Sequence, residues 1–177
     1  MKKKTLALVL ALTLLVAGVV GGTLAWLTDQ TAEVKNTFTV GDINIGLTET
    51  TADYKMVPGN TIAKDPTVTV EANSEACWLF VKVTESANLK DFITYAIAEG
   101  WTALSGVDGV YYREVPASTA DQTFSVLADD AVTVKSNVTK TMLETAKTDA
   151  PTLTFKAYAI QKDHFATADA AWAEVSK

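Results

Sequence analysis

The single histidine and the single cysteine of this 177-residue chain are the side chains best suited to nucleophilic chemistry. His164 lies in Lys162-Asp163-His164-Phe165, and Cys77 lies in the strand-like segment ACWLFVKV. A Ser-His-Asp or Cys-His site needs the histidine beside its nucleophile. No pattern in the sequence places Cys77 or a particular serine there. We therefore interpret His164 as a loop residue and Cys77 as a small buried apolar residue, with pairing between molecules as the alternative for the thiol.

Metal and cofactor sites are not indicated either. One histidine excludes an HExxH zinc site, one cysteine excludes a Cys/His structural zinc site, and neither GxGxxG nor a Walker A loop occurs. Asp129-Asp130 would need several further oxygens to hold calcium, so an exposed turn is the preferred interpretation. Asn137-Val138-Thr139 fits a glycosylation sequon, which is a common match. The sequence predicts no catalytic residues, no metal, no cofactor and no enzyme.

The charge balance narrows the range of partners. Fifteen basic residues face 21 acidic ones, for a net charge of −6, and Arg113 is the only arginine. Such a chain lacks the basic footprint that binds nucleic acid or an anionic membrane surface. We interpret the excess of acidic residues as a feature that keeps the chain soluble outside the cell.

The N-terminal segment has the three parts of a secretory signal. Lys2 to Lys4 form a positive start, residues 6–20 are apolar, and Gly21-Gly22 break that run before Thr23-Leu24-Ala25. Thr23 and Ala25 are small residues at the two positions that a signal peptidase inspects, which predicts cleavage after Ala25 and makes Trp26 the new N-terminus. The prediction is a signal helix at 1–25, an extended segment at 26–36 and a folded domain at 37–177.

A retained membrane anchor is the alternative. Residues 5–27 are uncharged and long enough to cross an apolar core of roughly 30 Å. The glycines and the lack of a following positive charge argue against it. In both cases the bulk of the chain lies outside the cytoplasm, and only an uncleaved signal would contact the membrane.

The remainder of the chain predicts β structure. Short runs of Val, Ile, Thr, Phe and Tyr are separated by Gly, Asn, Asp and Pro. The pattern favours an all-β fold, an antiparallel two-sheet sandwich or jelly roll, with a short helical turn at 167–175 whose N-cap is Thr167. The expected strands are residues 38–47, 67–71, 77–84, 92–97, 101–104, 110–115, 122–127, 131–134 and 152–161.

Three local features refine this expectation. The apolar alternation of the first strand changes phase at Gly41-Asp42, which predicts a bulge. Strands 67–71 and 77–84, joined by a polar turn, predict a hairpin, and so do 101–104 and 110–115. In the long strand, Trp78 and Phe80 make the outer face partly apolar, which indicates that this face is also covered. Residues 88–91 predict either a short helix or a loop.

The stretch NTFTVGDINIGLTE, after a glycine-rich signal end and an aromatic residue, resembles the TasA/camelysin family of Gram-positive bacteria. Phe38, Gly41, Ile43, Ile45 and Leu47 match the family's first mature strand. VPGNTIAKDPTVTVEANSEACWLFVKV is similar to its proline–glycine turn, lysine and following strands. VYYREV and LTFKAYAIQKDHF with AAWAEV are similar to late segments of small clostridial-type relatives.

The resemblance implies a secreted jelly-roll protein, processed by a SipW-type signal peptidase, that forms matrix fibres or coats surfaces. In fibre-forming members the mature N-terminal segment becomes a donor strand in the next subunit. Residues 26–35 fit that role, with Trp26, Ala32 and Val34 as apolar anchors on one side of an extended segment. A flexible terminus is the competing interpretation.

Fibre or surface-coat subunit is therefore the leading expectation. A monomeric secreted binding module, such as an adhesin, is the alternative, and Trp101, Tyr111 and Tyr112 are its candidate contact residues. A camelysin-type peptidase comes third, because the sequence has no recognisable metal-binding motif.

Overall fold

The computed structural model describes residues 42–50 and 54–177. All of them belong to the second of the chain's two units, Val40–Lys177. The expected signal helix, the extended segment 26–36 and Gly41 lie outside the described residues.

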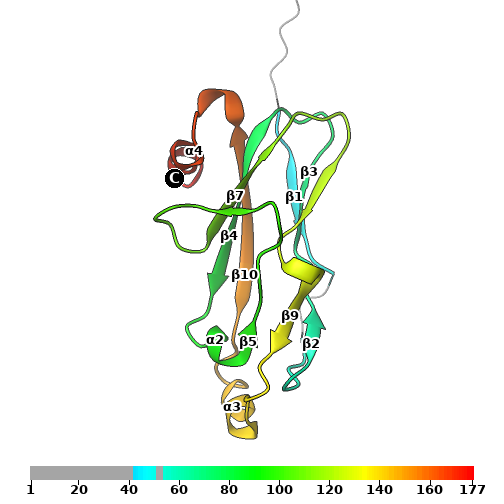
Figure 1. Ribbon diagram of the computed structural model, residues 1–177, viewed down its shortest axis with the longest axis vertical. Helices are drawn as coiled ribbons and strands as arrows, with labels where there is room; N and C mark the ends of the chain where they lie inside the picture. Colours follow the sequence, from blue (N-terminus) through cyan, green and yellow to red (C-terminus); the bar gives the residue numbers. More distant parts are fainter. Residues whose placement is uncertain (1–41, 51–53) are drawn as a thin grey trace, which may run out of the picture. The chain divides into compact units, whose positions relative to one another are not determined.

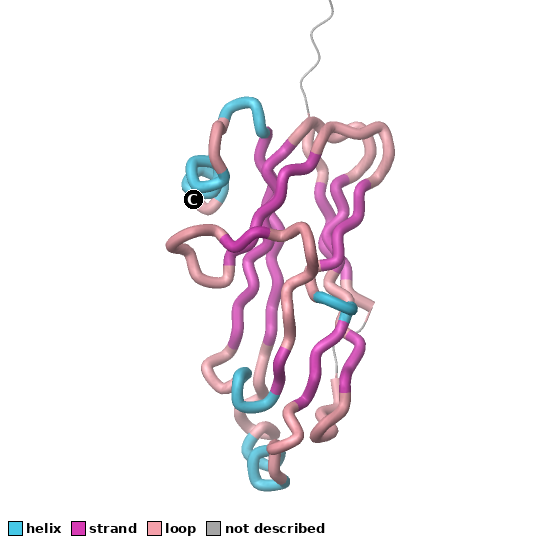
Figure 2. Tube along the Cα trace, in the orientation of Figure 1, coloured by secondary structure: helices cyan, strands magenta, loops and turns pink. Residues whose placement is uncertain are grey.

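The described part is mostly β, which confirms the all-β expectation (Figures 1 and 2). Its strands form three antiparallel sheets with the orders β1-β3-β8, β10-β4-β7-β6 and β2-β9-β5. Short helices lie in the connections and at the C-terminal end (Figure 2). The strands are β1 Ile45–Thr48, β2 Thr61–Ala63, β3 Thr67–Val70, β4 Cys77–Glu85, β5 Ile93–Thr94, β6 Thr102–Ala103, β7 Val110–Val115, β8 Gln122–Ser125, β9 Ala131–Val134 and β10 Leu153–Gln161. The helices are α2 Leu89–Phe92, α3 Lys140–Thr145 and α4 Ala168–Val175, with 3₁₀ turns η1 Ala128–Asp130 and η2 Lys162–His164.

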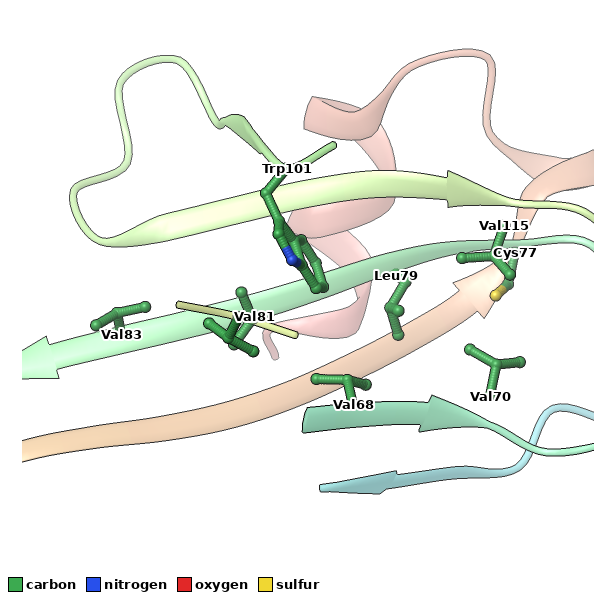
Figure 3. Close-up of a cluster of buried hydrophobic side chains, with 9 residues drawn as sticks. Val68, Val70, Cys77, Leu79, Val81, Val83, Trp101 and Val115 are labelled. Carbon is green, nitrogen blue, oxygen red and sulfur yellow. The ribbon is translucent and has the colours of Figure 1, made fainter. Parts of the chain in front are cut away.

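The main core lies between the sheets that contain β3 and β4 (Figure 3). Val68 and Val70 of β3 are almost fully buried against the core face of β4. Alternation along β4 produces this face, because every second side chain of a strand points the same way. The four β4 residues expected to share it all belong to this core: Cys77, Leu79, Val81 and Val83.

The outer face of β4 is also covered, as the sequence predicted. Trp78 and Phe80 pack in a second cluster with residues of α4. The Trp172 ring lies 5.3 Å from that of Phe80 and 5.2 Å from that of Tyr158, between ring centroids. Thr167 caps α4 as expected, since its hydroxyl accepts a hydrogen bond from the Ala170 amide.

One expected hairpin is wrong. β3 pairs with β1 and β8, whereas β4 pairs with β10 and β7, so the polar connection carries the chain from one sheet to the other. Asn73 has φ of 65° in this turn, and Ser74 forms an isolated bridge with Ser118. A polar turn predicts a change of direction but not which strand the chain pairs with next. The second expected hairpin, β6 with β7, is confirmed.

The third sheet has its own apolar cluster, built from β2, β9, β5 and α3. The sequence did not predict α3, although Thr139 caps it by accepting from the Met142 amide. The sequence predicted either a short helix or a loop at residues 88–91, and the structure has helix α2 there. This helix includes Phe92, the first residue of the strand expected at 92–97. β5 is therefore reduced to two residues.

Candidate functional site along strand β10

Strand β10 has one paired edge and one unpaired edge. All nine of its residues pair with β4, from Leu153 opposite Glu85 to Gln161 opposite Cys77. Among the described residues, no strand pairs with its other edge. β1 lies beside β10, but its pairing partner is β3. A row of backbone donors and acceptors at such an edge is a template for another strand.

The side chains along this edge are incompletely covered. On β4, Leu79 and Val81 are fully buried. Their partners Ala159 and Ala157 on β10 point into the same core but stay half-buried. Leu47 of β1 is 37% exposed, and it is one of the two large exposed hydrophobic residues in the described part. The core is therefore fully covered along β4 and only partly covered along the seam between β1 and β10.

Two grooves follow this seam at the start of β10, and both are lined by Leu153 and Thr154. The smaller, about 310 Å³, lies between the end of β1 and Leu153 to Phe155. The larger, about 540 Å³, is bounded by residues of β2, β5 and β9 and by 150–154, with a mainly apolar lining that includes Met56, Ile62 and Val132. A cleft of this size and lining accommodates a large side chain.

A buried lysine and its glutamate partner form an ion pair between these grooves, since Lys64 lines the larger one and Glu49 lines the smaller one. Lys64 is 7% exposed, and its Nζ lies 2.6 Å from Glu49 Oε1. The same Nζ lies 4.8 Å from the Tyr54 ring and 5.4 Å from the Phe155 ring, distances typical of cation–π contacts. The Tyr54 hydroxyl donates to Glu49 Oε1, and burial together with this carboxylate raises the pKa of Tyr54. The carboxylate of Glu49 thus holds both groups at the junction.

The predicted site residues fall mostly outside the described part. Ala25, Trp26, Ala32, Val34 and Gly41 all lie there, so the cleavage site, the anchors and the bulge stay predictions. Asp42 precedes β1, which begins at Ile45 rather than running through Asp42. Its carboxylate accepts from the Ile43 amide and from the Asn44 side chain.

The residues with potential for chemistry are not brought together. Cys77 is fully buried on the core face, and burial raises its pKa to about 11, so the thiol stays protonated at neutral pH. His164 is exposed in η2. Asp129 and Asp130 lie in η1 with positive φ, and Asn137 is exposed. No group of three or more His, Cys, Asp or Glu residues suited to a metal occurs among the described residues.

The aromatic residues considered for ligand binding belong to the cores. Trp101 is 9% exposed, Tyr111 packs against the main core and Tyr112 against the outer cluster. They do not form an exposed platform. Sequence reasoning missed the β10 edge, because alternation along 152–161 indicates a strand but not which of its edges is paired.

No protein family model, curated protein or solved structure matches this chain. Within the described part, no helix has the length and apolar character needed to span a membrane.

Proposed function

We propose that this chain is a secreted structural subunit that assembles into extracellular fibres or a surface coat by donor-strand exchange. The observation that carries the proposal is the unpaired edge of β10, where half-buried core side chains line two grooves. The donor is the segment 26–36 of another copy, released when a SipW-type peptidase cuts after Ala25. In this proposal the β1 and β4 sheets form a jelly-roll sandwich, which the donor strand extends.

Donor and acceptor strands agree in length. The nine residues of β10 match a donor running from Trp26 to Val34. An antiparallel donor, like every paired strand of the described sheets, sets the small side chains of Ala32 and Val34 beside Phe155 and Leu153. Trp26 then lies opposite Gln161 at the far end of β10, and Thr28 lies opposite Ala159. The small Ala32 opposes the large Phe155, an arrangement that close packing favours.

Deletion of residues 26–35 from the processed chain is the first experiment. The deletion should leave a folded, soluble monomer, because the described strands keep their own core. It should form no filaments by electron microscopy and no pellet in sedimentation, and the uncleaved precursor should behave in the same way. Filaments from the deleted chain would refute donor-strand exchange.

A matched pair of point variants separates the donor role from a loss of solubility. Ala32→Asp places a charge on the anchoring side of the segment, whereas Thr31→Asp places the same charge on the opposite side. Only Ala32→Asp should abolish filaments, because burial of an unpaired carboxylate costs several kcal/mol. Equal loss with both variants would contradict a strand that inserts with one face inward.

The alternative function is a monomeric secreted binding module. It becomes the better interpretation if the processed chain forms no filaments at any concentration, alone or with a partner protein. A camelysin-type peptidase is the third function, and casein digestion with and without chelator tests it.

A further inference from the structure

Arg113 lies between two aromatic rings at the side of the core away from β10. Its guanidinium carbon is 3.9 Å from the centroid of the Phe124 ring and 5.4 Å from that of Trp101. The indole of Trp101 is itself fixed, because its Nε1 donates to the Ser125 carbonyl at 2.9 Å. The stacking therefore holds the planar guanidinium in one orientation.

The guanidinium has no acceptor within the described residues. Its Nε is buried and makes no hydrogen bond, and none of the ion pairs of this part of the chain includes Arg113. The two terminal nitrogens have no hydrogen-bond partner among the described residues either, and they are not among the buried unpaired atoms, so they reach solvent. This is unexpected in a chain with 21 acidic residues. Burial lowers the pKa of Arg113, but arginine stays charged at neutral pH.

The backbone beside the guanidinium carries no side chain at Gly100. A Cβ on Gly100 would lie 3.0 Å from the terminal Nη2, so a larger residue there would crowd the guanidinium. The adjacent Glu99 is exposed and forms no ion pair with another described residue. A fixed fork with free donors is the arrangement that binds planar anions through two parallel hydrogen bonds.

We propose that Arg113, held by Trp101 and Phe124, is a binding site for a carboxylate. One positive charge matches one carboxylate, whereas a phosphate dianion is better held by several cations or a helix N-terminus. The net negative charge of the chain further disfavours the binding of polyanionic ligands. The ligand is a small organic acid or an acidic side chain of another protein, since both present the same group. This site is separate from the β10 seam and does not depend on donor-strand exchange.

Arginine-selective isotope labelling tests the site directly, because a chain with one arginine gives one guanidinium signal by NMR. Acetate should shift the Arg113 signal in a saturable way, while chloride at equal ionic strength should not. A short glutamate peptide with blocked ends distinguishes the two sources: tighter binding of the peptide favours a protein partner, and equal binding favours a small acid. A linear shift, or the same shift with chloride, would overturn the proposal.

Two variants complete the test. Arg113→Lys keeps the positive charge but loses the planar fork. In this variant acetate binding is followed by the Trp101 indole signal, and its saturable shift should be at least several-fold weaker than in the unchanged protein. Glu99→Gln should leave the Arg113 signal of the unliganded protein unchanged. A large change would mean that Glu99 occupies the fork as an internal ion pair, and the carboxylate site would then be refuted.

Discussion

Ala159 of β10 lies directly opposite Leu79 of β4 in the sheet register, yet Leu79 is fully buried and Ala159 remains half-buried. The two residues face the same core. The difference arises because β4 pairs with β10 on one side and β7 on the other, whereas within the described residues β10 pairs with β4 alone.

A change of side-chain size should therefore cost much more stability at Leu79 than at Ala159. Leu79→Ala should lower the free energy of unfolding by about 2–5 kcal/mol, through lost burial and a cavity. Ala159→Leu extends into an open seam and should cost less than about 1 kcal/mol in the monomer. Urea unfolding of both variants measures this. A large loss for Ala159→Leu would show that the seam is already filled.

Gly109 and Gly106 form a second matched pair, both with φ of +71° in the β6–β7 hairpin. A Cβ on Gly109 would lie 2.4 Å from the Val83 carbonyl oxygen, whereas a Cβ on Gly106 meets no atom within 4 Å. Gly106→Ala should cost about 1 kcal/mol, for the backbone conformation alone. Gly109→Ala should cost at least about 3 kcal/mol, since strand and loop must also separate. Equal thermal shifts would contradict this account.

The sequence predicted local features well and non-local ones poorly. The cap at Thr167, the strand at 131–134 and the covered outer face at Trp78 and Phe80 follow from neighbouring residues, and all are confirmed. The assignment of β3 and β4 to different sheets depends on partners far along the chain, so a local hairpin signal was misleading. The unpaired edge of β10 and the unpaired guanidinium of Arg113 could not be predicted from the sequence either, because both depend on which segments lie beside them in the fold.

The pair formed by Tyr95 and Glu85 predicts sensitivity to acid. The Tyr95 hydroxyl donates to Glu85 Oε1 at 2.6 Å and is the largest cause of the lowered pKa of Glu85, with Lys90 contributing less. The unfolded glutamate has a pKa of about 4.3, so this stabilisation is present above that pH and is lost as pH falls through the lower folded value. Tyr95→Phe should flatten the fall in stability below about pH 4.3. An unchanged acid slope would mean that Glu85 is not responsible.

Trp172 should anchor the C-terminal helix. Its ring contacts Phe80 and Tyr158, so Trp172→Ala removes much of the apolar surface that holds α4 on the outer face. We expect a loss of about 2–4 kcal/mol and faster amide exchange in α4. Glu174→Ala on the same helix, whose partner is the exposed Lys177, should cost less than about 1 kcal/mol. Equal effects would contradict a helix held by its aromatic side chain.

Crosslinking can test the donor strand at the level of single side chains. A cysteine at Ala32, in a Cys77→Ser background, should form disulfides with a cysteine on the core face of β10 in the neighbouring subunit. Leu153, Phe155 and Ala157 occupy that face, so one of the three should crosslink best and thereby reveal the register.

Lys156 is exposed on the opposite face and provides the matched control. Donor-strand exchange predicts ladders of covalent oligomers on non-reducing gels for a core-face position and none for Lys156, because side chains alternate across a strand. Ladders of equal strength at all four positions would indicate random collision, and filaments without ladders would indicate assembly through a different surface.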